Sequence, residues 1–161
     1  MTIGTLLTHW SARLAFLLYA VAVAAWLVRK PRAARLAWTS GFLLYLAHVT
    51  AAFHFRHHWS HSAAYEETAR QTAALFGVHS GVGLYANYVF TAIWALDVIW
   101  MWWSPDTYRR RPRWIAVAIH GFIAFMFFNA TVVFVTGSVR WLGLTVTIAL
   151  GMLTVYRFAR R

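Results

Sequence analysis

The sequence predicts an all-α protein, a polytopic transmembrane helical bundle of five spans, with the N-terminus outside and the C-terminus in the cytoplasm. Three observations lead to this prediction. Hydrophobic side chains make up 61% of the 161 residues and charged side chains only 12%, whereas soluble domains carry about 25% charged residues. The apolar residues form long stretches, and a soluble core of this size cannot hide them all. The basic residues lie in short runs between these stretches.

The five apolar stretches lie at about 10–28, 36–55, 78–103, 114–135 and 140–157. Each is close to the roughly 20 helical residues that cross a hydrocarbon core. The first stretch has neither a basic start nor a small-residue cleavage site, so we expect it to be retained as a helix. The spans form a single integral-membrane domain over 1–161, with one long histidine-rich connection at 56–77. In this connection Ser62 is expected to cap a helix that stops near Gly77.

The basic residues predict the orientation and the surroundings. Eleven of the fifteen lie in the loop at 29–35, the loop at 104–113 and the C-terminal tail, and loops rich in Lys and Arg stay in the cytoplasm. The connection at 56–77 therefore lies outside. Arginine outnumbers lysine 14 to 1, which is typical of GC-rich bacterial genomes and favours a bacterial inner (plasma) membrane. We expect the lipid bilayer and other membrane subunits or a homo-oligomer as partners, and no nucleic acid.

The histidines are the strongest indication of chemistry. If the second helix continues to residue 61, four imidazoles share a stripe about 100° wide, at spacings that let two of them hold one ion. A further histidine begins the third span, and two glutamates lie in the connection. The predicted metal ligands are His54, His57, His58, His61, His79, Glu66 and Glu67. Nitrogen and oxygen donors in a chain without cysteine suit copper, iron, manganese or zinc. The alternative is a solvated, weakly basic cap.

The string from His54 to His58 resembles the HxxHH box of membrane-bound di-iron desaturases and hydroxylases. The resemblance covers five residues. Those families carry several such boxes and present them on the cytosolic side, whereas this box is single and predicted to lie outside. Their reaction is therefore not carried over to this chain.

Three further polar residues fall inside predicted spans. His48, in the second span, is a candidate ligand of haem b, although no histidine at matching depth faces it. Asp97 and His120 both lie about 9 Å from the inner ends of their spans, which predicts a buried polar pair. This pair is either part of a proton relay or a carboxylate that orients a histidine ligand, and the alternative is a hydrogen bond that holds two helices together.

The residues favour one function and leave others open. The first hypothesis is a small integral membrane metalloprotein with an outward-facing His/Glu site for a transition metal, related to redox chemistry. The second is a non-catalytic small subunit of a larger membrane redox or photosynthetic complex. The third is a b-type haem cytochrome. Whether the protein is an enzyme is left undecided by the sequence.

Overall fold

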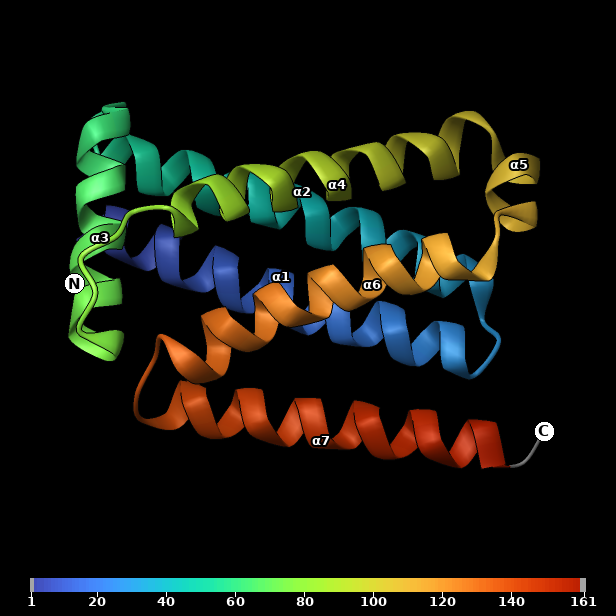
Figure 1. Ribbon diagram of the computed structural model, residues 1–161. Helices are drawn as coiled ribbons and strands as arrows, with labels where there is room; N and C mark the ends of the chain where they lie inside the picture. Colours follow the sequence, from blue (N-terminus) through green and yellow to red (C-terminus); the bar gives the residue numbers. More distant parts are fainter. Residues whose placement is uncertain (1, 160–161) are drawn as a thin grey trace.

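A computed structural model describes residues 2–159, and the chain is helical over nearly all of this range. The elements in chain order are α1 (Ile3–Leu27), α2 (Pro31–Phe55), α3 (His61–Phe76), α4 (Gly83–Trp103), α5 (Pro105–Arg110), α6 (Arg113–Phe128), the π-helical turn η1 (Asn129–Val133) and α7 (Ser138–Ala159). In Figure 1 the long helices α1, α2, α4, α6 and α7 lie side by side, with α3 across one end of the bundle and α5 at the other.

Five of these helices are long and apolar enough to cross a membrane, which confirms the predicted bundle. They are α1, α2, α4, α6 continued by η1, and α7 up to Arg157. The first two begin earlier than the hydropathy pattern predicts, because local signals start a helix before the apolar stretch does. The Thr2 side chain accepts a hydrogen bond from the Thr5 amide and caps α1, and Pro31 stands in the first turn of α2.

The core lies between α1, α2, α4 and α6. The most extensive contact joins the antiparallel helices α1 and α2, and α4 and α6 pack against each other. Aromatic rings fill the centre. Trp94 of α4 contacts Trp38 of α2 at a centroid distance of 5.2 Å and Phe127 of α6 at 5.6 Å, and Phe127 contacts Tyr19 of α1 at 4.7 Å. Rings of this size bury much apolar area and hold the four helices together.

The segment after α2 reverses direction and starts α3. His58 and Trp59 have positive φ values of 48° and 59°, which turn the chain sharply. The Ser60 side chain then accepts a hydrogen bond from the Ala63 amide and caps α3, so the predicted cap at Ser62 is wrong by two residues. Gly77 ends α3 in the left-handed conformation with φ 71°, as glycine does at many helix ends.

The connection from α3 to α4 is non-helical, so the third span begins at Gly83 rather than at 78. Gly81 lies directly against α3, and a Cβ atom at this position would come within 2.5 Å of the Tyr65 carbonyl oxygen. Only glycine permits this close approach. The segment therefore packs on α3 and does not extend the span.

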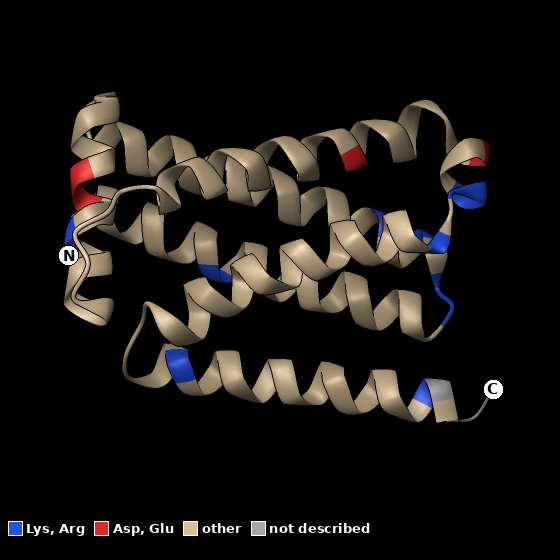
Figure 2. Cartoon of the chain, viewed as in Figure 1, with Lys and Arg blue, Asp and Glu red and all other residues tan. Residues whose placement is uncertain are grey.

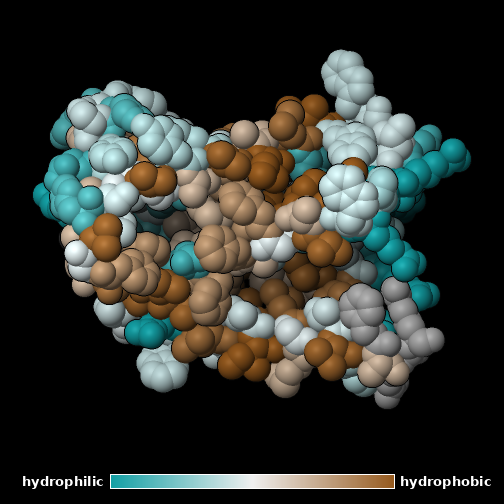
Figure 3. Space-filling view, in the orientation of Figure 1, coloured by the Kyte–Doolittle hydropathy of each residue, from teal (hydrophilic) through white to brown (hydrophobic). Residues whose placement is uncertain are grey.

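The two ends of the bundle differ in charge. Most Lys and Arg residues gather beside α5 and the α1–α2 loop, which we call the arginine end (Figure 2). The opposite end, which carries 54–82 with α3, is called the histidine end. Between them the visible surface is mainly apolar, with hydrophilic groups concentrated at the two ends (Figure 3). This arrangement suits a bilayer. That the arginine end faces the cytoplasm stays a prediction.

Candidate functional site

At the histidine end, α2 stops at Phe55 and does not reach His61. The stripe of imidazoles on one helix requires this continuation, so it does not form. His54 stays on the last turn of α2, His57 and His58 lie in the reversal, and His61 begins α3. The positive φ values at His58 and Trp59 are the physical reason, because two left-handed residues in a row break a helix.

Each of these histidines has surroundings of its own. The His54 ring packs edge-on against Phe55 at 4.6 Å, and the His57 ring packs edge-on against Phe53 at 5.6 Å. His61 Nδ1 lies 2.9 Å from the Tyr88 hydroxyl of α4. His79 Nε2 lies 3.0 Å from Glu66 Oε1. His58 is exposed.

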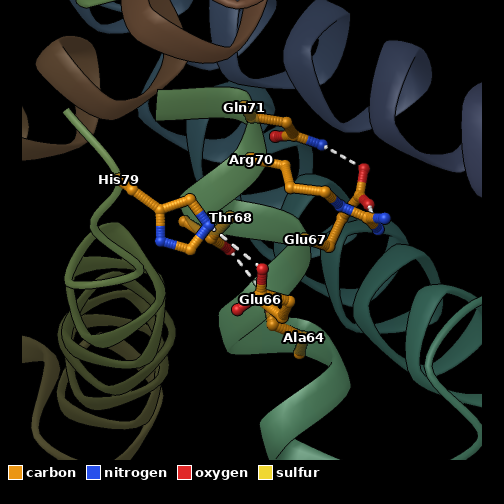
Figure 4. A network of polar contacts seen from close by, with 7 residues as sticks. All are labelled: Ala64, Glu66, Glu67, Thr68, Arg70, Gln71 and His79. Carbon is orange, nitrogen blue, oxygen red and sulfur yellow. Dashed lines mark hydrogen bonds and ion pairs between the residues drawn. The ribbon is translucent and has the colours of Figure 1, made fainter. Parts of the chain in front are cut away.

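Glu66 and Glu67 form hydrogen bonds with different neighbours (Figure 4). Glu66 points toward His79, whereas Glu67 accepts hydrogen bonds from Arg70 and, at 2.9 Å, from the Gln71 amide. Over residues 2–159 no three His, Asp or Glu side chains come together in a way that could hold a metal ion. The histidine end therefore offers one His–Glu pair, and the larger ligand set predicted from the sequence stays a hypothesis that this geometry does not support.

An open cleft of about 260 Å³ lies at this end, lined by Arg56, His57, Glu66, Glu67 and Arg70, with Ala63. The hydrogen bond from Gln71 lowers the pKa of Glu67, and Arg70 adds to this effect. Burial lowers the pKa of His57, although the nearby Glu67 charge opposes the shift. Two guanidinium groups share the cleft with the two carboxylates, so its charge balance does not favour a metal cation.

A second polar cluster lies inside the bundle near the arginine end. Arg111 stands at its centre: Nη1 lies 3.4 Å from Asp97 Oδ1, and Nη2 lies 3.4 Å from His120 Nε2. The Tyr108 hydroxyl donates to Asp97 Oδ2 at 3.0 Å. Asp97 and His120 thus contact the same Arg111 side chain, which lies between them where the sequence predicts a direct pair.

Three elements build this cluster. Asp97 comes from the inside of α4, where its side chain is 0% exposed, and His120 comes from α6. Pro105 starts the short helix α5, which carries Tyr108, and Arg111 follows it with a side chain that is 9% exposed. The Trp100 indole donates to the Thr107 hydroxyl at 2.8 Å and holds α5 against α4. Burial raises the pKa of Tyr108, so its hydroxyl keeps the proton that it donates to Asp97.

The protonation of His120 follows from its neighbours. A guanidinium group can only donate hydrogen bonds, so His120 Nε2 must accept, and the proton of the neutral ring lies on Nδ1. His120 Nδ1 is buried without a hydrogen-bond partner in the described structure. Its ring packs edge-on against Trp26 at 4.6 Å and Trp38 at 4.9 Å. The cluster is therefore enclosed by aromatic side chains.

His48 links α2 to α1 through a hydrogen bond. Its Nδ1 lies 2.8 Å from the Thr8 carbonyl oxygen, and because a carbonyl accepts, Nδ1 must donate. This leaves Nε2 as the nitrogen that could bind a haem iron. Among the other candidate ligands, His120 is engaged at the arginine end and His79 pairs with Glu66. Neither His120 nor His79 is therefore placed as a second axial ligand for a haem on His48.

Sequence reasoning missed Arg111 and Tyr108. Both lie in the basic segment at 104–113, which was interpreted only as a signal of membrane orientation. A carboxylate one or two turns from the end of a span and an arginine run directly after that span could have indicated an ion pair. Which of four neighbouring arginines turns inward depends on the path of α5.

Comparison of the chain with protein-family models, curated proteins and solved structures gives no match. The class of protein is therefore inferred from the chain's own structure. It is an integral membrane protein, an all-helical bundle of five spans.

Proposed function

We propose that the protein is a non-catalytic small subunit of a larger membrane complex. The observation that carries the proposal is the exposure of α7. Only 6% of its apolar stretch is buried within the chain, against 22% to 33% in the other four spans. α7 contacts the bundle through α1, α6 and η1, so most of its surface is left for lipid or for another protein.

Two exposed glycines support a protein at this side of the bundle. A Cβ atom added at Gly151 of α7 or at Gly121 of α6 would meet no atom within 4 Å. Glycine weakens a helix, and the packing of this chain does not require its small size at either position. In membranes, small residues at exposed positions allow a second helix to approach closely.

The polar groups also support a structural role. Arg111 holds Asp97 and His120 together inside the bundle, and His48 joins two helices. For the metalloprotein hypothesis, a transition metal at the His79–Glu66 pair would need further ligands from a partner chain. For the cytochrome hypothesis, a haem on His48 would need a second axial ligand, which neither His79 nor His120 is placed to provide. On the arginine-rich composition, we further propose the plasma membrane of a bacterium.

The proposal is tested on protein with a C-terminal tag, extracted from its native membrane in polymer-bounded lipid discs. We expect a particle heavier than the 18.5 kDa chain that contains other membrane proteins, identified by mass spectrometry. Gly151→Leu is expected to release them. Ala92→Leu, which introduces the same side chain on the exposed face of α4, is the matched control and should retain them.

Two outcomes would overturn the proposal. A particle that contains this chain alone, with lipid, excludes a larger complex. A stoichiometric transition metal, measured by elemental analysis, or a Soret band in the absorption spectrum of the isolated chain would instead support the metalloprotein or the cytochrome.

A further inference from the structure

Arg13 is a positive charge inside a membrane span. It lies ten residues after Ile3 in α1, about 15 Å along the helix. It is the only charged residue of this helix and gives the blue segment part-way along α1 in Figure 2. A charged side chain at such a depth normally pairs with another group, because hydrocarbon cannot solvate it.

The chain has no side-chain carboxylate left for Arg13. It contains four acidic residues, and each is already engaged. Glu66 pairs with His79, and Glu67 pairs with Arg70. Asp97 pairs with Arg111, and Asp106 pairs with Arg109. A carboxylate or phosphate that pairs with Arg13 therefore comes from outside these four side chains.

The direction of the Arg13 side chain indicates where this anion lies. Its guanidinium carbon is 5.3 Å from the centre of the Trp10 ring. Trp10 is one turn closer to the start of α1, so the side chain reaches toward the histidine end. Trp10 is 52% exposed, and exposed tryptophans in membrane proteins prefer the level of the lipid headgroups. The guanidinium thus lies just beneath the headgroup layer.

A second arginine lies at the same end. Arg140 is in the first turn of α7, a helix that contacts α1. It forms no ion pair within residues 2–159, and its neighbour Trp141 is 70% exposed. Each of the two contacting helices therefore presents one arginine and one exposed tryptophan at this end of the bundle.

We propose that Arg13 binds the phosphate group of a phospholipid in the leaflet at the histidine end, where Arg140 adds a second positive charge. A guanidinium presents paired N–H groups that match two phosphate oxygens. The acyl chains of the lipid would lie along the apolar surface below. This site is independent of the proposed subunit function.

The test is native mass spectrometry of the delipidated, purified full chain titrated with phosphatidylglycerol. We expect one tightly retained lipid, and a loss of affinity of at least tenfold in Arg13→Gln. Arg140→Gln should weaken binding less. Arg70→Gln, at the same end but paired with Glu67, is the matched control and should bind as the wild type does. Arg13→Lys keeps the charge without the paired donors, so an intermediate affinity is expected. Circular dichroism and gel filtration establish that each variant is folded.

Three results would overturn the proposal. Equal retention of phosphatidylglycerol by wild type and Arg13→Gln excludes a role for Arg13. Equal retention of diacylglycerol, which lacks the phosphate, or displacement of the lipid by millimolar inorganic phosphate excludes a lipid phosphate as the ligand. Loss of a co-purifying membrane protein in Arg13→Gln, with lipid binding unchanged, would assign the charge to a partner carboxylate.

Discussion

Arg111 determines the environment of the buried residues at the arginine end. Its guanidinium is almost fully enclosed and contacts both Asp97 and His120. A buried pair of this kind gives little net stability, because both charges lose their water. Removing one partner lowers the stability of the folded protein much more, because the other charge is then buried without a counter-charge. The cluster therefore behaves as a unit.

Single and double substitutions should reveal this coupling. Asp97→Asn and Arg111→Met are each expected to lower the free energy of unfolding by about 3 kcal/mol, and the double variant by clearly less than the sum. Thermal unfolding in detergent micelles measures all four proteins. Arg109→Met is the control, since Arg109 is 74% exposed in its pair with Asp106 and should change stability little. Additive single effects would contradict the coupling.

Acid should loosen the histidine end in two steps. The pKa of His57 lies below its ordinary value of 6.5, so the folded state favours the neutral ring, and stability falls as the pH drops through that value. The pKa of Glu67 lies below its ordinary value of 4.5, so its contribution is complete above 4.5 and is lost as the pH falls through the lowered pKa. Hydrogen exchange of the α3 amides, expressed as protection factors, should show both steps. His57→Gln should remove only the upper step and Glu67→Gln only the lower, and unchanged profiles would exclude these two groups.

At the scale of elements, the position of α3 depends more on interactions at its two ends than on packing against the bundle. Ala64 and Ala69 are its only buried residues, so little apolar surface anchors it to the bundle. The Ser60 cap and the close approach of Gly81 to Tyr65 therefore decide where it lies.

Two neighbouring serines distinguish the observed cap from the one expected from the sequence. Ser60→Ala removes the acceptor for the Ala63 amide and should destabilise α3 by about 1 kcal/mol. Ser62→Ala should have little effect, because Ser62 is exposed and bonds only to the Ser60 hydroxyl. Amide hydrogen exchange at the start of α3 measures both variants. Equal losses of protection would contradict Ser60 as the cap.

At the scale of the whole molecule, the two ends face opposite sides of the membrane. Since the chain has no cysteine, single cysteines report the orientation cleanly. Ser62→Cys and Arg110→Cys lie at exposed positions at the histidine end and the arginine end. A maleimide that cannot cross membranes should label Ser62→Cys in intact cells, and Arg110→Cys only after permeabilisation. The reverse pattern would invert the predicted orientation.

By itself the sequence determined the all-helical membrane bundle, its five spans and the unequal charge of its two ends. Hydropathy over about 20 residues and the position of basic loops are local properties, so they can be read without knowing any contact. The similar depth of Asp97 and His120 also predicted that these two side chains lie near each other.

Only the tertiary structure decided which polar side chains contact one another. The left-handed residues His58 and Trp59 prevent α2 from continuing beyond Phe55 to His61. The predicted metal-binding stripe on one helix therefore does not form. The path of α5 turns Arg111, and not its neighbours, between Asp97 and His120. All four acidic side chains pair with other residues, which leaves Arg13 without an ion pair among residues 2–159. Each of these results depends on the geometry of a turn or on contacts between distant segments, which a pattern along one chain does not contain.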